Sequence, residues 1–166
     1  MPPPRQKRYR KAFPRHNPKV FIVHGHNEGI RETVARFLER LGCKAVILHE
    51  LPSKGKTIFQ KFTAHSEVDF AVVLLTADDR GGPAKIRHRR QRKRARQNVI
   101  LELGFFLVAL GPDKVCSLYE DEVELPSDYA GVVYIPLGQG EKWRALLARE
   151  LESAGFEIDS KQLLMT

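Results

Sequence analysis

The sequence predicts an α/β domain in which a five-stranded parallel sheet lies between two layers of helices. Short, almost wholly apolar segments alternate along the chain with segments whose apolar residues recur at helical spacing, and this alternation is typical of βαβ units. The chain has 166 residues and a hydrophobic content of 42%, which is enough for one domain with a substantial core. In such sheets, ligands bind beyond the carboxyl ends of the strands.

The first half of the chain supplies two predicted strands and two predicted helices. Val20–Val23 is an apolar run typical of a buried parallel strand. Asn27 is suited to cap the helix that follows, and Gly42 is suited to end it. The next segments predict a strand ("CKAVILHE"), a polar loop ("LPSKGK") and a short helix marked by Ile58, Phe59, Phe62 and His65.

The second half begins with the strongest strand signal in the chain, "VDFAVVLLTADD". A basic loop is predicted from Arg80 to about Arg94, followed by a well-buried helix from about Arg96 to Leu110. Two more strands ("KVCSLYE" and "AGVVYIPL") and an amphipathic helix ("EKWRALLARELESAG") close the domain. Five strands in this arrangement favour a flavodoxin-like, doubly wound three-layer sandwich.

The net charge of +8 comes from two basic segments joined to an acidic domain. Residues 1–19 contain seven Lys/Arg and residues 85–96 contain eight, with no acidic residue in either, whereas the rest of the chain has 13 basic and 20 acidic residues. The two segments could bind nucleic acid or another polyanion, or they could be a solvated tail and loop. Residues 85–96 contain none of the aromatic side chains on which single-stranded bases stack.

The predicted domain spans residues 19–159, between a basic, disordered tail at residues 1–18 and a C-terminal tail at residues 160–166. The N-terminus lacks the apolar stretch of a secretory signal, and no apolar run approaches the ~20 residues of a membrane span, so we expect a cytoplasmic protein. Cys43 and Cys116 lie in apolar runs and are expected to be buried thiols.

The loop after the first strand, "HGHNE", lies at the predicted ligand-binding edge. His24 and His26 form a His-x-His pair, but no matching cluster of ligands occurs elsewhere, so no metal site is predicted. Both side chains could contact a ligand or simply pack within the loop. Gly25 allows a ligand or a backbone segment to approach closely.

Two further loops supply candidate binding residues. "PSKGKT" lacks the full phosphate-loop pattern, but Lys54 and Lys56 could meet a substrate phosphate if they do not simply lie on a solvated turn. After the third strand, Thr76 opens the loop "TADDRGG" at the ligand-binding edge. Asp78 and Asp79 in this loop are either a carboxylate pair for acid–base chemistry or ordinary turn residues.

Glu102 is the only ionisable residue between Val99 and Leu110. The predicted helix places Asn98 on the same face, one turn earlier. Because burying an unpaired carboxylate costs several kcal/mol, Glu102 should be salt-bridged, exposed on a narrow stripe or turned toward a cleft.

Five segments in this order resemble the TIR (Toll/interleukin receptor) domain of prokaryotic CBASS and Pycsar antiphage effectors. They are "VFIVHGHNE", "LHELPSKGKTIFQKF", "DFAVVLLTADD", "RARQNVILELGFF" and "LPSDYAGVVYIPL", and they cover roughly residues 19–159. The resemblance implies a flavodoxin-like fold and NAD⁺ hydrolase activity, with NAD⁺ as substrate and no cofactor.

The resemblance also implies roles for particular residues. "NVILELG" places Glu102 at the position of the family's essential glutamate. Leu51 to Thr57 correspond to the loop that gates the site and mediates assembly, and His24, Gly25 and His26 correspond to residues that line the pocket. Effectors of this family are commonly fused to a sensor module, which neither residues 1–18 nor those after residue 159 resemble.

Three functions are therefore open. The first is an NAD⁺ glycohydrolase of antiphage defence that is active as a homo-oligomer or filament. The second is a non-enzymatic nucleotide-binding or scaffold TIR module. The third is a nucleic-acid binder that uses its basic segments, with a polyanion contact at Lys85–Arg96.

Overall fold

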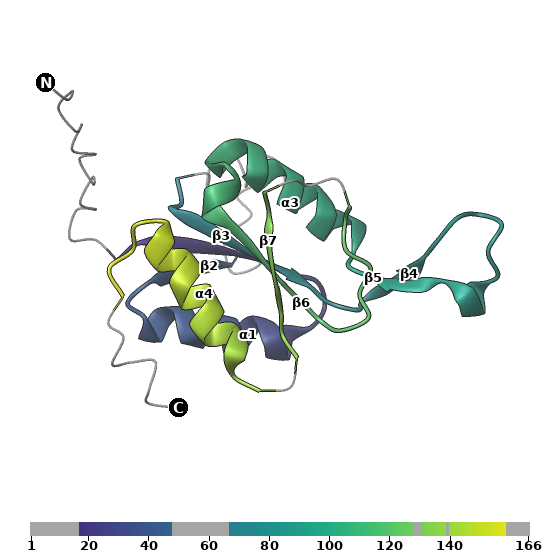
Figure 1. The fold of residues 1–166 in the computed structure, drawn as a ribbon, viewed down its shortest axis with the longest axis horizontal. Helices are drawn as coiled ribbons and strands as arrows, with labels where there is room; N and C mark the ends of the chain where they lie inside the picture. Colours follow the sequence, from purple (N-terminus) through teal and green to yellow (C-terminus); the bar gives the residue numbers. More distant parts are fainter. Residues whose placement is uncertain (1–16, 48–66, 128–130, 139, 159–166) are drawn as a thin grey trace, which may run out of the picture.

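A computed structural model describes residues 17–47, 67–127, 131–138 and 140–158. One parallel sheet organises them (Figure 1). Its strands, in spatial order, are β2 (Lys44–Ile47), β1 (Lys19–Val23), β3 (Phe70–Leu75), β6 (Val115–Tyr119) and β7 (Val133–Pro136). Counted along the chain, this is the 2-1-3-4-5 order of flavodoxin-like sheets, so the predicted fold class is confirmed.

Helices cover both faces of the sheet. α1 (Glu28–Arg40) and α4 (Lys142–Ser153) pack on one face, and α3 (Gln97–Leu110) packs on the other. Two single-turn 3₁₀ helices, η2 (His88–Arg90) and η3 (Pro112–Lys114), lie in connections. The predicted short helix at residues 58–65 lies outside the described residues.

The core has two halves because neighbouring side chains of a strand point to opposite faces. All six residues of β3 are buried, and they alternate between the two halves. On one side Phe37 of α1 packs against Trp143 of α4, with ring centroids 5.2 Å apart. On the other side Phe21 of β1 packs against Phe106 of α3 at 4.8 Å. Helices thus pack against both faces of the sheet, and the loops at the carboxyl ends of the strands carry the candidate binding residues.

The helix ends agree with the sequence. The side chain of Asn27 accepts a hydrogen bond from the Ile30 N–H at 3.1 Å and so caps α1. Gly42 follows the end of α1 with φ of +81°, and Gly111 follows α3 with φ of +84°. Both are left-handed conformations that glycine adopts without a steric penalty.

The two cysteines are buried free thiols, as predicted. Burial raises the pKa of Cys43 to about 11 and that of Cys116 to about 12, which keeps both protonated and unreactive at neutral pH. Within the described residues, no helix is both long enough and apolar enough to cross a membrane.

Two predictions need correction. The basic segment after β3 is a β-hairpin and not a loop: β4 (Asp79–Gly81) pairs antiparallel with β5 (Arg92–Arg94). Its strands contain no β-branched or aromatic residue, so local propensity gave no signal for it. The α3 helix is also less buried than its composition predicts, because Leu101 is 71% exposed and Val108 is 90% exposed.

Candidate active site

The loops that follow β1, β3 and β6 meet at the carboxyl edge of the sheet. They are adjacent because these three strands are neighbours in the sheet and run in the same direction. Carboxylates from two of the loops, Asp78 and Glu120, make the hydrogen bonds that join them. The edge is therefore a connected polar structure built on buried strands.

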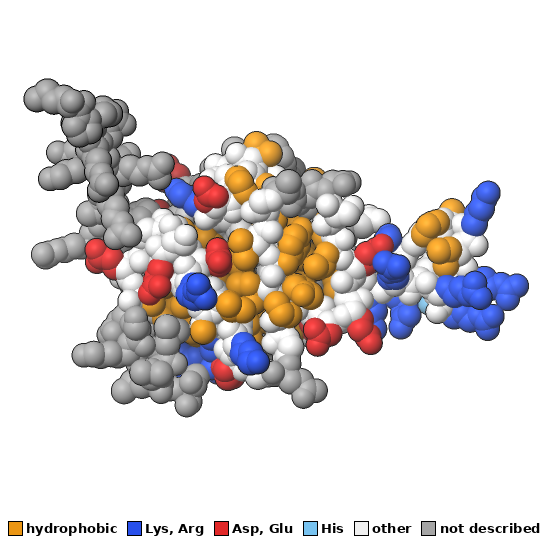
Figure 2. All heavy atoms as spheres, in the orientation of Figure 1, with side chains coloured by type: hydrophobic (Ala, Val, Ile, Leu, Met, Phe, Trp, Pro, Cys, Tyr) orange, Lys and Arg blue, Asp and Glu red, His pale blue; other side chains and the backbone are white. Residues whose placement is uncertain are grey.

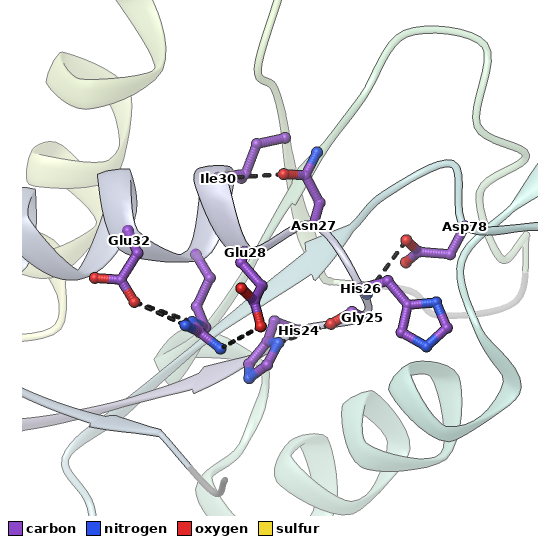
Figure 3. A network of polar contacts seen from close by, with 9 residues as sticks. His24, Gly25, His26, Asn27, Glu28, Ile30, Glu32 and Asp78 are labelled. Carbon is purple, nitrogen blue, oxygen red and sulfur yellow. Dashed lines mark hydrogen bonds and ion pairs between the residues drawn. The ribbon is translucent and has the colours of Figure 1, made fainter. Parts of the chain in front are cut away.

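Asp78 fastens the loop after β3 to the loop after β1 (Figure 3). Its Oδ1 accepts a hydrogen bond from the His26 backbone N–H at 3.2 Å, and its Oδ2 accepts one from the Thr76 hydroxyl at 2.5 Å. Gly25 leaves room for this carboxylate, because an ideal Cβ at Gly25 would lie 1.9 Å from Oδ2. The close approach predicted at Gly25 is therefore made by a side chain of the same protein.

Glu120 fastens a third segment to the same edge, and the sequence analysis did not select it. It follows β6, and its Oε1 accepts a hydrogen bond from the Asn27 side chain at 3.1 Å. Its Oε2 accepts one from the Ala77 backbone N–H at 2.7 Å. The rule that selected the loops after the first and third strands, applied to the strand "KVCSLYE", would have found this residue.

The two predicted histidines have different surroundings. His24 is half-buried, and its Nδ1 donates a hydrogen bond to the Gly25 carbonyl at 2.8 Å. His26 is exposed, and its Nε2 accepts a hydrogen bond from the Arg96 guanidinium. An arginine only donates, so Nε2 of His26 is the acceptor in this contact. Through it, the loop after β1 contacts the residue that immediately precedes α3.

Glu102 lies on α3, one turn beyond Asn98. The helix buries Val99, Leu103 and Phe106 against the sheet, and Glu102 is partly buried beside this face, whereas Asn98 is exposed. Burial raises the pKa of Glu102 to about 7, and it forms no ion pair with any other described residue. Of the three environments considered for this carboxylate, a salt bridge within the described part of the chain is excluded.

The remaining predicted site residues divide into two groups. Thr76 is buried, and its hydroxyl donates a hydrogen bond to Asp78, whose other oxygen accepts one from the His26 N–H. We call these two hydrogen bonds, which join the loop after β3 to the loop after β1, the loop clamp. Lys54 and Lys56 lie outside the described residues. In the ranges that the structure describes, no group of three or more His, Cys, Asp or Glu side chains could hold a metal ion.

A pocket of about 380 Å³ opens on the α1–α4 side of the sheet, opposite α3. Its lining includes Ile30, Thr33, Glu120, Asp121 and Trp143. None of the predicted site residues lines it. Glu102 lies on α3, which packs on the opposite face of the sheet, so this pocket does not include it.

Comparison with known proteins agrees with the fold. The family model for the TIR domain of CAP12/Pycsar effector proteins matches residues 19–158, which include β1, α3 and the Asp78–Glu120 edge. The uncharacterized protein YuaY of Escherichia coli (strain K12) is 44% identical over 147 residues, and the match covers 88% of this chain and 48% of YuaY. Protein tirC of Dictyostelium discoideum is 34% identical over 126 residues, which are 70% of this chain and 63% of tirC.

The chain thus spans about half the length of YuaY and somewhat less than two thirds of tirC. The family match itself covers nearly all of the described structure, whose five-stranded parallel sheet is of the predicted flavodoxin-like class. The chain belongs to the TIR domain family of CAP12/Pycsar effector proteins.

Proposed function

We propose that this TIR domain is an NAD⁺ glycohydrolase in which Glu102 is the catalytic residue. The observation that carries the proposal is the environment of Glu102. Its carboxylate lies on a helix that has no other ionisable residue from Val99 to Leu110, burial raises its pKa to about 7, and it has no ion-pair partner in the described chain. Perturbed carboxylates of this kind are concentrated at functional sites.

The chemistry of NAD⁺ suits a single carboxylate. Ordinary glycosidases need an acid to protonate the leaving oxygen and a second carboxylate at the sugar. In NAD⁺ the leaving group is a cationic pyridinium that departs as neutral nicotinamide, so no general acid is required. Water attacks C1′ as the C1′–N bond breaks, and the products are ADP-ribose, nicotinamide and a proton.

Glu102 would act on the ribose. Its ionised carboxylate can orient the ribose hydroxyls and stabilise the positive charge that develops at C1′, and it can guide the attacking water. The cationic nicotinamide ring would itself favour the ionised form of a carboxyl whose pKa is raised by burial. We assign His24, His26, Asn98, Lys54 and Lys56 to substrate contact.

The loop clamp would act indirectly. The polar groups of Thr76 and Asp78 are hydrogen-bonded to each other and to the His26 backbone. We therefore assign these two residues to positioning the loop after β1, which carries His24 and His26. Substrate contact by Thr76 and Asp78 stays a prediction.

Self-assembly is part of the proposal. We propose that the domain acts as an antiphage effector whose turnover rises when copies associate, so that an isolated protomer is nearly silent. Family membership supports this role.

The test is NAD⁺ consumption with release of nicotinamide, measured in dilute buffer and under crowding that promotes assembly. Wild-type protein should cleave NAD⁺, more strongly when crowded, and Glu102→Gln should not. Glu150→Gln is the matched control, because Glu150 is a partly buried glutamate of α4 on the opposite side of the sheet. Binding of NAD⁺ without turnover in both conditions would contradict the proposed NAD⁺ glycohydrolase activity and favour a nucleotide-binding module.

A further inference from the structure

The β4–β5 hairpin, residues 79–94, forms a basic arm that projects from the body of the domain (Figure 1). It contains eight Lys/Arg and one Asp. Only three residues of each strand are paired, from Asp79↔Arg94 to Gly81↔Arg92, and residues 82–91 form the tip. The arm lies between β3 and α3 in the sequence, and the proposed NAD⁺ chemistry does not use its charges.

The base of the arm is neutralised by its own chain. The Lys93 ammonium lies 2.7 Å from Glu122, and Arg94 forms an ion pair with Glu124. These cations lower the pKa values of both glutamates, Lys93 chiefly through its hydrogen bond to Glu122 and Arg94 through its hydrogen bond to Glu124. The Glu124 backbone N–H also donates a hydrogen bond to the Lys93 carbonyl at 2.9 Å. The charges at the base therefore serve to hold the arm against the body.

The tip is not neutralised in this way. Residues 83–90 are all exposed, and Figure 2 shows Lys and Arg side chains gathered at the end of the arm. Lys85, Arg87, Arg89 and Arg90 form no ion pair with any acidic side chain in the described chain. Holding four like charges together on an exposed turn is unfavourable without a counter-charge.

We propose that the tip of the arm binds double-stranded nucleic acid through its phosphates. Two features select this ligand. Three of the four tip cations are arginines, whose planar forks match phosphate oxygens better than an ammonium does. The arm contains no Phe, Tyr or Trp, so it lacks the stacking platform of a single-strand binder.

An acidic protein surface is the competing ligand, and the structure favours it less. The acidic side chains next to the arm, Glu122 and Glu124, are already paired with its base. Elsewhere on the face seen in Figure 2 the acidic side chains are scattered among other groups, whereas a nucleic-acid backbone presents anions at regular, close spacing.

Fluorescence anisotropy with a short labelled DNA duplex, over a series of salt concentrations, tests the proposal. The arm variant replaces Lys85, Arg87, Arg89 and Arg90 with Gln. The control variant removes the same charge from exposed positions on α1 and α4, by replacing Arg36, Arg40, Lys142 and Arg149 with Gln. Both variants keep the basic residues 1–19, so the comparison isolates the arm.

The wild-type protein should show a linear fall of log affinity with log salt. Because each phosphate contact contributes about 0.9 to this slope on B-DNA, the arm variant should lose about 3 to 4 units of slope and at least about tenfold in affinity at low salt. The control variant should lose little of either. Equal losses in the two variants would overturn the proposal, because net charge alone would then explain the binding.

Three unlabelled competitors test the identity of the ligand. Unlabelled duplex should displace the labelled duplex at much lower concentration than single-stranded DNA of the same length or poly-glutamate. Equal or better displacement by single strands would overturn the duplex assignment, and equal displacement by poly-glutamate would indicate a general acidic partner. Thermal unfolding of both variants should match the wild type, because all eight substituted side chains are exposed and lie outside the two buried clusters of the core.

Discussion

The carboxylate of Asp78 occupies the space that a side chain would need at Gly25. An ideal Cβ at Gly25 would lie 1.9 Å from Asp78 Oδ2 and 2.9 Å from its Cγ. Glycine is therefore required here by a neighbour in space, 53 positions along the chain, and not by backbone strain. The contact fixes the loop that carries His24 and His26 against the end of β3.

Gly25→Ala should destabilise the protein by about 1–3 kcal/mol, because Asp78 must move away and lose hydrogen bonds to the His26 N–H and the Thr76 hydroxyl. Urea unfolding measures this change. Gly29→Ala is the control, because its Cβ would meet its nearest neighbour at an ordinary 3.6 Å. In an Asp78→Ala background the cost of Gly25→Ala should shrink; an unchanged cost would show that the two residues are not coupled.

Glu120→Ala should loosen the edge of the sheet, because the side chain of Asn27 and the backbone N–H of Ala77 each lose an acceptor. We expect a loss of about 1–3 kcal/mol in the free energy of unfolding and a lower kcat/KM for NAD⁺. Asp121→Ala, at the exposed next position, should change neither quantity appreciably. Equal effects of the two substitutions would argue against a specific role for Glu120.

The rate of NAD⁺ cleavage should depend on pH through Glu102. In the proposed mechanism the ionised carboxylate is the active form, and its fraction rises with pH through a pKa of about 7, so kcat/KM should rise over the same range and then level. The kcat profile should lie at lower pH, because bound cationic nicotinamide favours the ionised form. A kcat/KM that does not change across neutral pH would contradict the catalytic assignment.

Glu102→Gln should stabilise the protein at alkaline pH while it abolishes turnover. The pKa of Glu102 is raised from 4.5 to about 7 on folding, so the folded state binds more protons between these values and the wild-type free energy of unfolding falls as pH rises through them. Above the folded pKa the wild type carries the full cost, up to about 3 kcal/mol, which the amide avoids. The difference in melting temperature should therefore be largest above pH 7 and shrink toward pH 4.5. A difference that is independent of pH would contradict burial as the cause.

The parts of the fold that were predicted correctly are those in which local pattern and tertiary burial agree. β3 is buried at all six positions and reads as apolar in the sequence, and Asn27 and Gly42 have the local chemistry of helix ends. The hairpin was missed because the acidic residues that neutralise its base, Glu122 and Glu124, lie about 30 positions downstream.

The sequence also indicated which loops and which helix carry the candidate site, but not the contacts between them. The topology rule for parallel sheets selected the loops after β1 and β3, and the family resemblance selected Glu102. The pairing of Asp78 with Gly25, and the contact between His26 and Arg96, depend on how the loops pack across strands, which spacing alone does not encode. The exposure of Leu101 and Val108 was missed because composition indicates burial but not how many sides of a helix are covered.

Each end of the arm lies next to a residue that contacts the loop carrying His24 and His26. β4 begins at the residue after Asp78, and β5 ends two residues before Arg96, whose side chain contacts His26. Both ends of the arm are therefore within two residues of the contacts that hold the loop carrying His26, so a displacement of the arm would act on these contacts as well as on the Glu122 and Glu124 ion pairs at its base.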